Sequence, residues 1–469
     1  MPEVMKKKQS LGKFDLTTII VGSSIGTGIF GLGSDLAKAA APGPALIAWL
    51  IVGTGAVCLV ASLNNLGQKQ SESGIFGYAG KCFGPMGEFV SGWIYWISGW
   101  MGNVAYAMML MSAIGFFMPE LKGMGNFLKI FSSILILWFL SFLVSRGIKS
   151  ASFINAIATC AKVIPLILFI VVMAVSFKAG ILTADFWGKV NDSAISGTYQ
   201  STSVFKQISS SLMVMVWAFY GLEGASLLSK RAEKPSDARI ASIIGMIILI
   251  VIYMLISLLP YGVLSRHELA SCPQPAMSYV MQKVVGPWGV IAINSGIVIS
   301  TLSAWLAWTL LPGETLMILA KDEVLPKVFG KQNKHGAPEN ALIFGAILQT
   351  FFLISLYFTE DSYKYAYTIA TSAIFIVYLF VGLDQIKYSY EHEKYGNLLI
   401  GIGVIVPQIW ALLMFRYWQA LGLFVLYLPG LALYAYARKE CGKRLEIKEK
   451  VVIVLSVLAG IEIISMAFF

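Results

Sequence analysis

The sequence predicts an all-α membrane protein whose chain crosses a bilayer twelve times, with a thirteenth apolar run at its C-terminal end. Hydrophobic residues make up 57% of the 469 residues and charged residues only 13%, whereas soluble proteins carry roughly 25% charged residues. The apolar residues come in blocks of about 20, the length that a helix needs to cross a hydrocarbon core of ~30 Å. Short gaps separate the blocks, so we expect one membrane domain.

The apolar blocks follow one another almost to the end of the chain. We expect spans at 14–40, 43–67, 86–118, 126–145, 152–177, 204–229, 239–264, 286–320, 340–358, 363–386, 397–415 and 418–437, and the further run at 450–469. That last run either crosses the bilayer or lies in its interface. We assign residues 1–13 to a tail, 14–390 to a core and 391–469 to accessory helices. The first span has no cleavage signature before it, so it reads as a helix rather than a signal peptide.

The net charge of +10 does not predict a nucleic-acid partner, because no soluble stretch is long enough to carry a basic stripe. With a cytoplasmic N-terminus, about two thirds of the 35 lysines and arginines fall in cytoplasmic segments, which is the bias of membrane proteins. We therefore predict a multi-pass protein of the cell membrane whose N-terminus is cytoplasmic. The three histidines and five cysteines lack the spacing of metal ligands. We therefore expect that the protein binds no metal or cofactor and is not an enzyme.

Glycines interrupt the first span at residues 22–30, GSSIGTGIF. In lipid, a break in a helix is tolerated only against protein or a water-filled cavity. One interpretation is a small-residue face that packs against another helix. The other is an unwound stretch whose free N–H groups and half-helix N-terminus bind an anion.

Glycines also interrupt the sixth span at residues 217–225, WAFYGLEGA, with Glu223 among them. Spans one and six would begin the two halves of a five-plus-five repeat, at about 14–177 and 204–386. Paired interruptions at corresponding positions point to a transporter site. Glu223 is a candidate functional acid, because a charge inside the bilayer costs roughly 3 kcal/mol; the alternative is a structural acid bonded to a broken helix.

Lys162 lies well inside the fifth span, so it is the second charged candidate. Its ammonium could occupy the place of a coupling cation, or it could reach the interface along its own side chain. Several aromatic residues also lie within spans near breaks, Tyr95, Trp217 and Trp308 among them. A cation over such a ring gains about 2 kcal/mol when desolvated, although any one of these rings alone is more typical of packing.

Five segments carry a resemblance: residues 22–30 and 217–225 above, YAGKCFGP at 78–85, YWISGWMGN at 95–103 and WTLLPGET at 308–315. From Leu11 to about Arg438 the chain resembles the amino acid–polyamine–organocation superfamily, specifically its basic amino acid/polyamine antiporters. The stretch from 321 to 341 is most similar to the arginine/ornithine antiporters. The resemblance implies a LeuT-like fold of two inverted five-helix repeats with broken helices one and six. It is also compatible with a homodimer.

The resemblance also implies a site for a cationic amino acid. The carboxylate would meet Thr27 and the amides near Gly26 and Gly28, and the α-ammonium would meet carbonyls near Ser24, Ile25 and Trp217. The side-chain cation would stack on Trp217, beside the polar groups of Ser98, Asn103 and Ser372 and near Tyr220. Trp308 would act as a middle gate, and Tyr95, Glu223 and Phe380 would form the inner gate.

Three departures from the arginine/agmatine exchangers favour an amino acid as the counter-substrate: Tyr220 replaces an aliphatic residue, Gly99 a cysteine and Phe380 a tyrosine. The resemblance therefore implies exchange of arginine for ornithine. Arginine/agmatine exchange remains an alternative, as does proton-coupled uptake of cationic amino acids, lysine included, through Lys162 or Glu223. A channel would require a symmetric filter or a ring of like charges, and the sequence shows neither.

Overall fold

The structure is a computed structural model that describes residues 24–67, 75–121, 127–147, 151–189, 203–219, 221, 234–358, 362–415 and 417–468, with positions 13, 17 and 21. Within these ranges every regular element is a helix. The longer helices are α2 (Gly28–Ala39), α3 (Pro42–Gly67), α4 (Gly77–Ile114), α5 (Phe127–Ser145), α6 (Ala151–Val175), α9 (Val204–Ala218), α11 (Pro235–Leu258), α14 (Pro287–Lys321), α15 (Glu339–Ser355), α16 (Ser362–Glu391), α17 (Leu398–Leu413), α18 (Tyr417–Glu440) and α19 (Ile447–Phe468).

Nine helices in the described ranges are long and apolar enough to cross a membrane, and two shorter apolar helices lie at 162–175 and 204–216. Each expected span overlaps a helix, because uninterrupted apolar runs of this length have no other way to satisfy their backbone in lipid. The last apolar run forms α19, which packs on α18.

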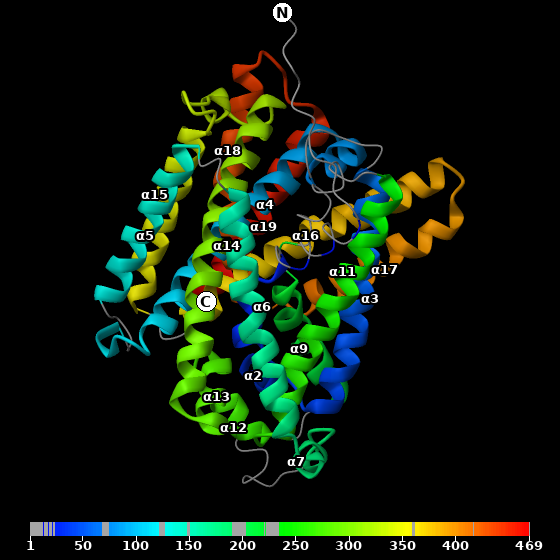
Figure 1. The fold of residues 1–469 in the computed structure, drawn as a ribbon. Helices are drawn as coiled ribbons and strands as arrows, with labels where there is room; N and C mark the ends of the chain where they lie inside the picture. Colours follow the sequence, from blue (N-terminus) through cyan, green and yellow to red (C-terminus); the bar gives the residue numbers. More distant parts are fainter. Residues whose placement is uncertain are drawn as a thin grey trace, which may run out of the picture.

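Helix α4 forms the centre of the fold, between α14 and α16 (Figure 1). Glycines let α4 and α14 approach closely: a Cβ on Gly92 would lie 2.5 Å from Leu319, and one on Gly99 would lie 2.6 Å from Pro312. Small residues are the usual means by which membrane helices pack, because their backbones then come into van der Waals contact. Helices α5 and α15 lie side by side at one edge of the molecule (Figure 1).

Helix α4 begins at Gly77, before the span expected from residue 86. Its 38 residues would measure ~57 Å as one straight helix, nearly twice the hydrocarbon core. Gly84 interrupts it with a φ of 71°, and Pro85 follows. Glycine adopts this left-handed backbone without a Cβ penalty, so residues 77–83 turn away from the span proper. Following the predicted topology with a cytoplasmic N-terminus, we call the end where α4 begins the inner end.

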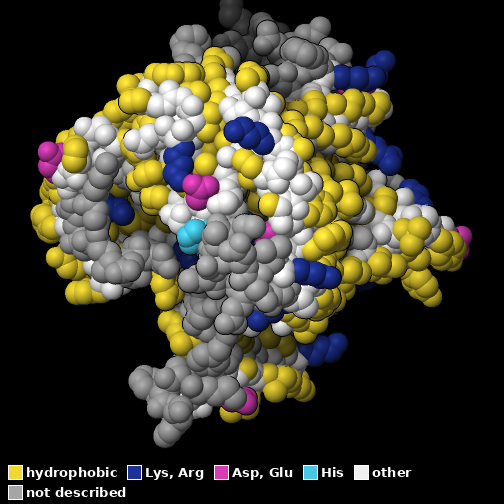
Figure 2. Space-filling view, turned by 90° about the horizontal axis from the view of Figure 1, so that it is seen from below, with side chains coloured by type: hydrophobic (Ala, Val, Ile, Leu, Met, Phe, Trp, Pro, Cys, Tyr) yellow, Lys and Arg dark blue, Asp and Glu magenta, His cyan; other side chains and the backbone are white. Residues whose placement is uncertain are grey.

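The connection between α11 and α14, most of which lies outside the expected spans, contains the 3-10 turn η3 (Leu259–Gly262) and the helices α12 (Arg266–Ser271) and α13 (Ala276–Val285). With α7 (Ala179–Ala184), α12 and α13 lie at the lower end in Figure 1, which we call the outer end. Seen from this end, hydrophobic side chains make up much of the flanks, and charged side chains lie among them on the facing surface (Figure 2). That distribution suits a protein surrounded by lipid.

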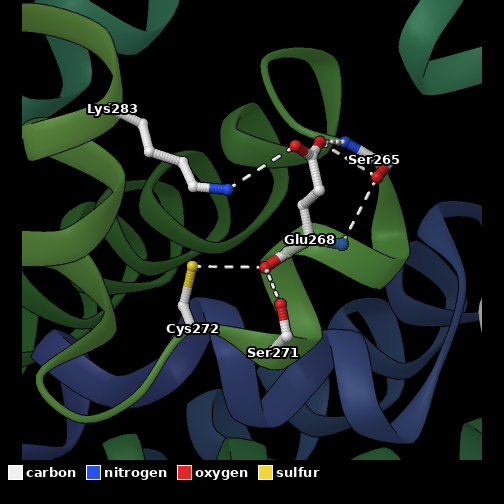
Figure 3. Close-up of polar contacts among 5 residues, drawn as sticks. All are labelled: Ser265, Glu268, Ser271, Cys272 and Lys283. Atoms are coloured by element: carbon white, nitrogen blue, oxygen red, sulfur yellow. Dashed lines mark hydrogen bonds and ion pairs between the residues drawn. The ribbon is translucent and has the colours of Figure 1, made fainter.

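A capping box begins α12 (Figure 3). The Ser265 hydroxyl accepts a hydrogen bond from the Glu268 amide at 3.3 Å, and the Glu268 carboxylate accepts one from the Ser265 amide at 3.1 Å. Lys283 of α13 pairs with the same carboxylate at 3.5 Å. Partial burial raises the pKa of Glu268, but the bonds from Ser265 and the charge of Lys283 outweigh it, so the net pKa lies below its ordinary value. The capping box stabilises the start of α12, and the ion pair with Lys283 links α12 to α13.

Candidate functional site

The first span is not one continuous helix. The Ile25 amide still donates to the Val21 carbonyl at 3.3 Å, but residues 25–27 belong to no helix and α2 begins at Gly28. The Phe30 amide then donates to the Thr27 carbonyl at 3.1 Å. The predicted break therefore lies between Ser24 and Gly28. Amides at the start of α2 have no intrahelical acceptor, and the α2 dipole points its positive end toward them.

Two buried hydroxyls flank this break. Ser24 is 1% exposed and Thr27 is fully buried, and neither side-chain oxygen has a hydrogen-bond partner among the described residues. Thr27 is the N-cap residue of α2, yet its hydroxyl does not cap the helix. A buried hydroxyl without a partner costs roughly 1–3 kcal/mol. Such polar atoms beside a helix N-terminus form a site for a ligand that can hydrogen bond.

Two tyrosines lie beside the break, and neither was predicted as a site residue. The Tyr253 hydroxyl of α11 donates to the Ser24 carbonyl at 3.1 Å. A Cβ on Gly26 would lie 3.4 Å from the Tyr106 hydroxyl of α4, so this tyrosine of α4 lies next to the break. The signal for Tyr253 was its place in the middle of an apolar span, where a polar group needs a partner.

The sixth span also ends its helix at the expected glycine. Helix α9 stops at Ala218, and Gly221 takes a φ of 102°. A Cβ on Gly221 would lie 3.3 Å from the Trp308 ring of α14, so α9 ends against the residue expected as the middle gate. Trp217 lies in the last turn of α9, but its side chain, together with Tyr220 and Glu223, falls outside the described residues.

The predicted polar site residues on α4 and α16 are buried within the helix bundle. The Ser98 hydroxyl donates to the Ala370 carbonyl at 2.7 Å, and the Ser372 hydroxyl donates to the Thr368 carbonyl at 2.8 Å. The Asn103 amide nitrogen donates to the Trp308 carbonyl at 2.9 Å.

Asn103 is 1% exposed, and its side-chain oxygen has no partner within the described ranges. A hydroxyl that donates its proton keeps lone pairs on its oxygen, so all three side chains can still accept from a cation.

The expected gate residues are not all together. The rings of Tyr95 and Trp308 are 6.3 Å apart, and Tyr95 also lies 6.4 Å from Phe76. Phe380 instead pairs with Phe83 at 5.5 Å and lines a cavity toward α18 and α19. The structure thus joins Tyr95 to Trp308 and places Phe380 against the first turns of α4.

Lys162 lies on α6, which packs against α14. It is 3% exposed, so its ammonium lies inside the protein and does not reach the lipid surface. No three His, Cys, Asp or Glu side chains come together as metal ligands in the part of the chain that the structure describes.

The outer half of the region is covered by the connection between α11 and α14. The Arg266 guanidinium donates to the Ala37 carbonyl at 3.0 Å, the Ser34 hydroxyl to the Cys272 carbonyl at 2.8 Å, and the Gln274 amide to the Gly31 carbonyl at 3.3 Å. These bonds attach α12 and α13 along α2. Helix α2, which follows the break, therefore lies beneath an outer cover and packs against α9, α11, α12 and α13.

The protein consists of membrane-spanning helices, one of which is broken within its span, with buried polar groups beside the break. This is the architecture of a solute transporter. The amino acid permease family model matches residues 11–435, and the chain belongs to this family, as the resemblance predicted. The chain is 46% identical over 442 residues to the arginine/ornithine antiporter of Latilactobacillus sakei, covering 93% of this chain and 92% of that protein.

More distant relatives cover the chain almost as fully. The arginine/ornithine antiporter of Pseudomonas aeruginosa is 37% identical over 460 residues, 94% of this chain and 93% of its own length. The arginine/agmatine antiporter of Chlamydia abortus is 34% identical over 395 residues, 84% of this chain and 80% of its own. The multi-pass architecture and the family thus agree with the sequence prediction.

Proposed function

We propose that the protein is an antiporter that exchanges external arginine for internal ornithine across the cell membrane, by alternating access around one fixed site. The names of the two arginine/ornithine relatives support the substrate pair. The observation that carries the proposal is the break at residues 25–27, with the buried and unpartnered hydroxyls of Ser24 and Thr27 beside it. The relatives' names support the substrates, whereas the break supports the position of the binding site.

The main-chain part of the amino acid binds at the break. Its carboxylate accepts from the Thr27 hydroxyl and from the first amides of α2, near Gly26 and Gly28, where the helix dipole favours an anion. Its α-ammonium donates to carbonyls at Ser24 and Ile25. A carbonyl has two lone pairs, so the Tyr253 bond to Ser24 leaves one for the substrate.

The cationic side chain of the substrate extends toward α4. The Asn103 side-chain oxygen is a buried acceptor, and the oxygens of Ser98 and Ser372 are two more. Trp217 provides the aromatic face, and Trp308 separates this space from the inner end. A larger residue does not fit at position 99, because its Cβ would lie 2.6 Å from Pro312.

The remaining expectations from the resemblance belong to the same proposal. The two inverted repeats of a LeuT-like fold cover about 14–177 and 204–386, the N-terminus is cytoplasmic, and the inner gate contains Tyr95, Glu223 and Phe380. Alternating access then moves the two broken spans against α4 and α14.

Two alternatives are open to the same test. The Chlamydia relative favours agmatine as a counter-substrate, and that exchange moves net charge because agmatine carries one more positive charge than arginine. The buried ammonium of Lys162 favours proton coupling. Arginine and ornithine carry the same charge at neutral pH, so their exchange is electroneutral.

Purified protein is reconstituted into liposomes that contain arginine, ornithine, agmatine, lysine or no amino acid, and uptake of labelled arginine is followed. We expect uptake only into vesicles loaded with arginine or ornithine, at a rate independent of membrane potential. Potential-dependent uptake into agmatine-loaded vesicles would favour the first alternative. Uptake into empty vesicles driven by a pH gradient would overturn exchange.

The aromatic assignment has its own test. We expect Trp217→Leu to weaken arginine binding far more than Trp308→Leu, because only the first ring stacks on the cation, a contact of about 2 kcal/mol when desolvated. Equilibrium binding of labelled arginine measures both. Equal losses in the two variants would contradict the assignment.

A further inference from the structure

A cavity of about 840 Å³ lies between α4, α16, α18 and the start of α19. Its walls are mostly apolar and include Phe83, Val90, Ile94, Ile376, Phe380 and Val452. The lining does not include Ser24, Thr27, Ser98 or Asn103, so this cavity is separate from the proposed amino acid site. It is also too apolar to hold a zwitterion.

The cavity is elongated along the helices. Its lining residues Met86, Val90 and Ile94 repeat every four positions on α4, and Lys448, Val452 and Ser456 repeat in the same way on α19. Residues four apart lie on one face of a helix, and two such steps cover ~12 Å. The cavity is therefore a slot that runs along α4 and α19, and its length of ~12 Å suits part of a hydrocarbon chain.

The surface around the slot is apolar and faces outward. Phe83 is 52% exposed although it is a large hydrophobic residue, and Leu455 and Leu458 on α19 are 60% and 56% exposed. Side chains of this kind on a helix of a membrane protein face lipid. Leu455 and Leu458 lie on the same helix as the lining residues Val452 and Ser456, so the slot borders a lipid-facing surface.

The inner mouth of the slot carries charge. Lys448 and Glu446 both line the slot, and both are exposed. The buried Glu449 is already engaged, because it accepts from the Tyr434 hydroxyl and pairs with Arg438 at 3.9 Å.

Residues 438–450 contain twice as many lysines and arginines as glutamates. In the lining, Glu446 and Lys448 offset each other and Glu449 is paired with Arg438, so the net positive charge comes from the other lysines and arginines of this segment. A net basic segment beside an apolar slot between membrane helices suits an anionic lipid headgroup.

We propose that this slot binds a phospholipid with a net negative headgroup, one acyl chain lying against Phe83 and Phe380 and the phosphate beside Lys448. The lipid fills the space behind the Phe83–Phe380 ring pair and so limits how far Phe380 can move. The consequence for transport rests on the proposed function, in which Phe380 belongs to the inner gate. The binding itself does not depend on it.

The binding test uses the full-length protein, delipidated in detergent and titrated with phosphatidylglycerol. Native mass spectrometry counts the bound lipid. We expect one phosphatidylglycerol per chain, and an affinity about fivefold lower in Lys448→Gln, since one lysine near a headgroup contributes about 1 kcal/mol. Lys450→Gln is the matched control, because Lys450 is exposed on the same helix but does not line the slot.

A second pair of variants tests the slot itself. Val452→Trp fills it, whereas Leu455→Trp adds the same ring to the lipid-facing side of α19. We expect the first variant to lose phosphatidylglycerol and the second to retain it, with both eluting as monodisperse protein. Equal retention in the two tryptophan variants, equal effects of the two glutamine variants, or equal affinity for phosphatidylcholine would overturn the proposal.

The transport consequence is measured in vesicles of phosphatidylcholine with and without phosphatidylglycerol. We expect wild-type exchange to change with phosphatidylglycerol content and Val452→Trp exchange to be insensitive to it. A wild-type protein that binds the lipid but exchanges no amino acid in any vesicle would contradict the proposed function and leave the lipid site standing.

Discussion

Replacing Thr27 with valine separates the stability of the protein from its affinity for substrate. Thr27 is fully buried, and its hydroxyl neither caps α2 nor meets another partner among the described residues. Valine has nearly the same shape and lacks only the hydroxyl. In the substrate-free protein, the substitution therefore removes a buried polar group that makes no hydrogen bond.

The two effects of Thr27→Val have opposite signs. Removing an unsatisfied hydroxyl stabilises the substrate-free protein by up to about 1–3 kcal/mol. Losing a hydrogen bond to a carboxylate costs about 1.5–3 kcal/mol, which weakens arginine binding roughly 10- to 150-fold. Few substitutions in a binding site raise stability while lowering affinity, so the combination is diagnostic.

The assay is a thermal melt of the purified protein with and without arginine, together with equilibrium binding. At 100 times its dissociation constant, a ligand adds about 2.7 kcal/mol to stability, and we expect most of that gain to disappear in Thr27→Val at the same arginine concentration. Thr301→Val is the matched control: Thr301 of α14 is also fully buried, and its hydroxyl has no partner within the described ranges. It should gain stability without losing affinity.

Three results would refute the reasoning about Thr27. An unchanged affinity for arginine would place the carboxylate elsewhere. A lower melting temperature without substrate would mean that the hydroxyl makes a bond that stabilises the fold. An equal loss of affinity in the Thr301 variant would mean that the loss is not specific to the break. Thr27→Ser, which keeps the hydroxyl, should restore binding.

Three further substitutions have expected outcomes. Tyr253→Phe removes the hydrogen bond to the Ser24 carbonyl. We expect the free energy of unfolding to fall by about 1 kcal/mol, and the melting temperature to fall with it. Gly221→Val combines a φ of 102° with a Cβ 3.3 Å from Trp308; we expect slower exchange and a cost of about 1–3 kcal/mol, and unchanged rates would contradict this. Glu268→Gln weakens the α12 cap by about 1 kcal/mol. The pKa of Glu268 is lowered in the folded protein, so the wild-type advantage is complete above pH ~4.3 and disappears as the pH falls through the folded pKa. Melts from pH 3 to pH 7 test this, and a constant difference would contradict it.

Much of the helical architecture could be predicted from the sequence, because one strong signal determines it. A run of about 20 apolar residues in lipid has to be a helix, so the spans followed from composition alone. The first turns of α4 were missed for a physical reason. Residues 77–85 contain three glycines and a proline, a pattern that predicts a loop, but contacts with α16 hold the segment as helix.

The position of the first break could also be predicted, because glycines around one threonine in an apolar run leave few other interpretations. The contacts that hold the break could not. Tyr253 reaches Ser24 across 229 positions of sequence, and no local pattern reports a pairing at that distance. Phe380 shows the same limit: its place in the sequence suits a gate, but only the packing shows that it faces Phe83.

The contacts around the break divide the region into two groups. Tyr253 ties the break to α11, whereas Asn103 ties α4 to α14 and Ser98 ties α4 to α16. The close glycine contacts at Gly92 and Gly99 strengthen the second group. A bound arginine would bridge the two groups, its carboxylate and ammonium on one and its guanidinium on the other. If the two groups of helices can move together only when a substrate bridges them, the empty protein cannot change from one open state to the other. Transport then requires a substrate on each side of the membrane. Obligatory exchange then follows from which helices each end of the substrate holds.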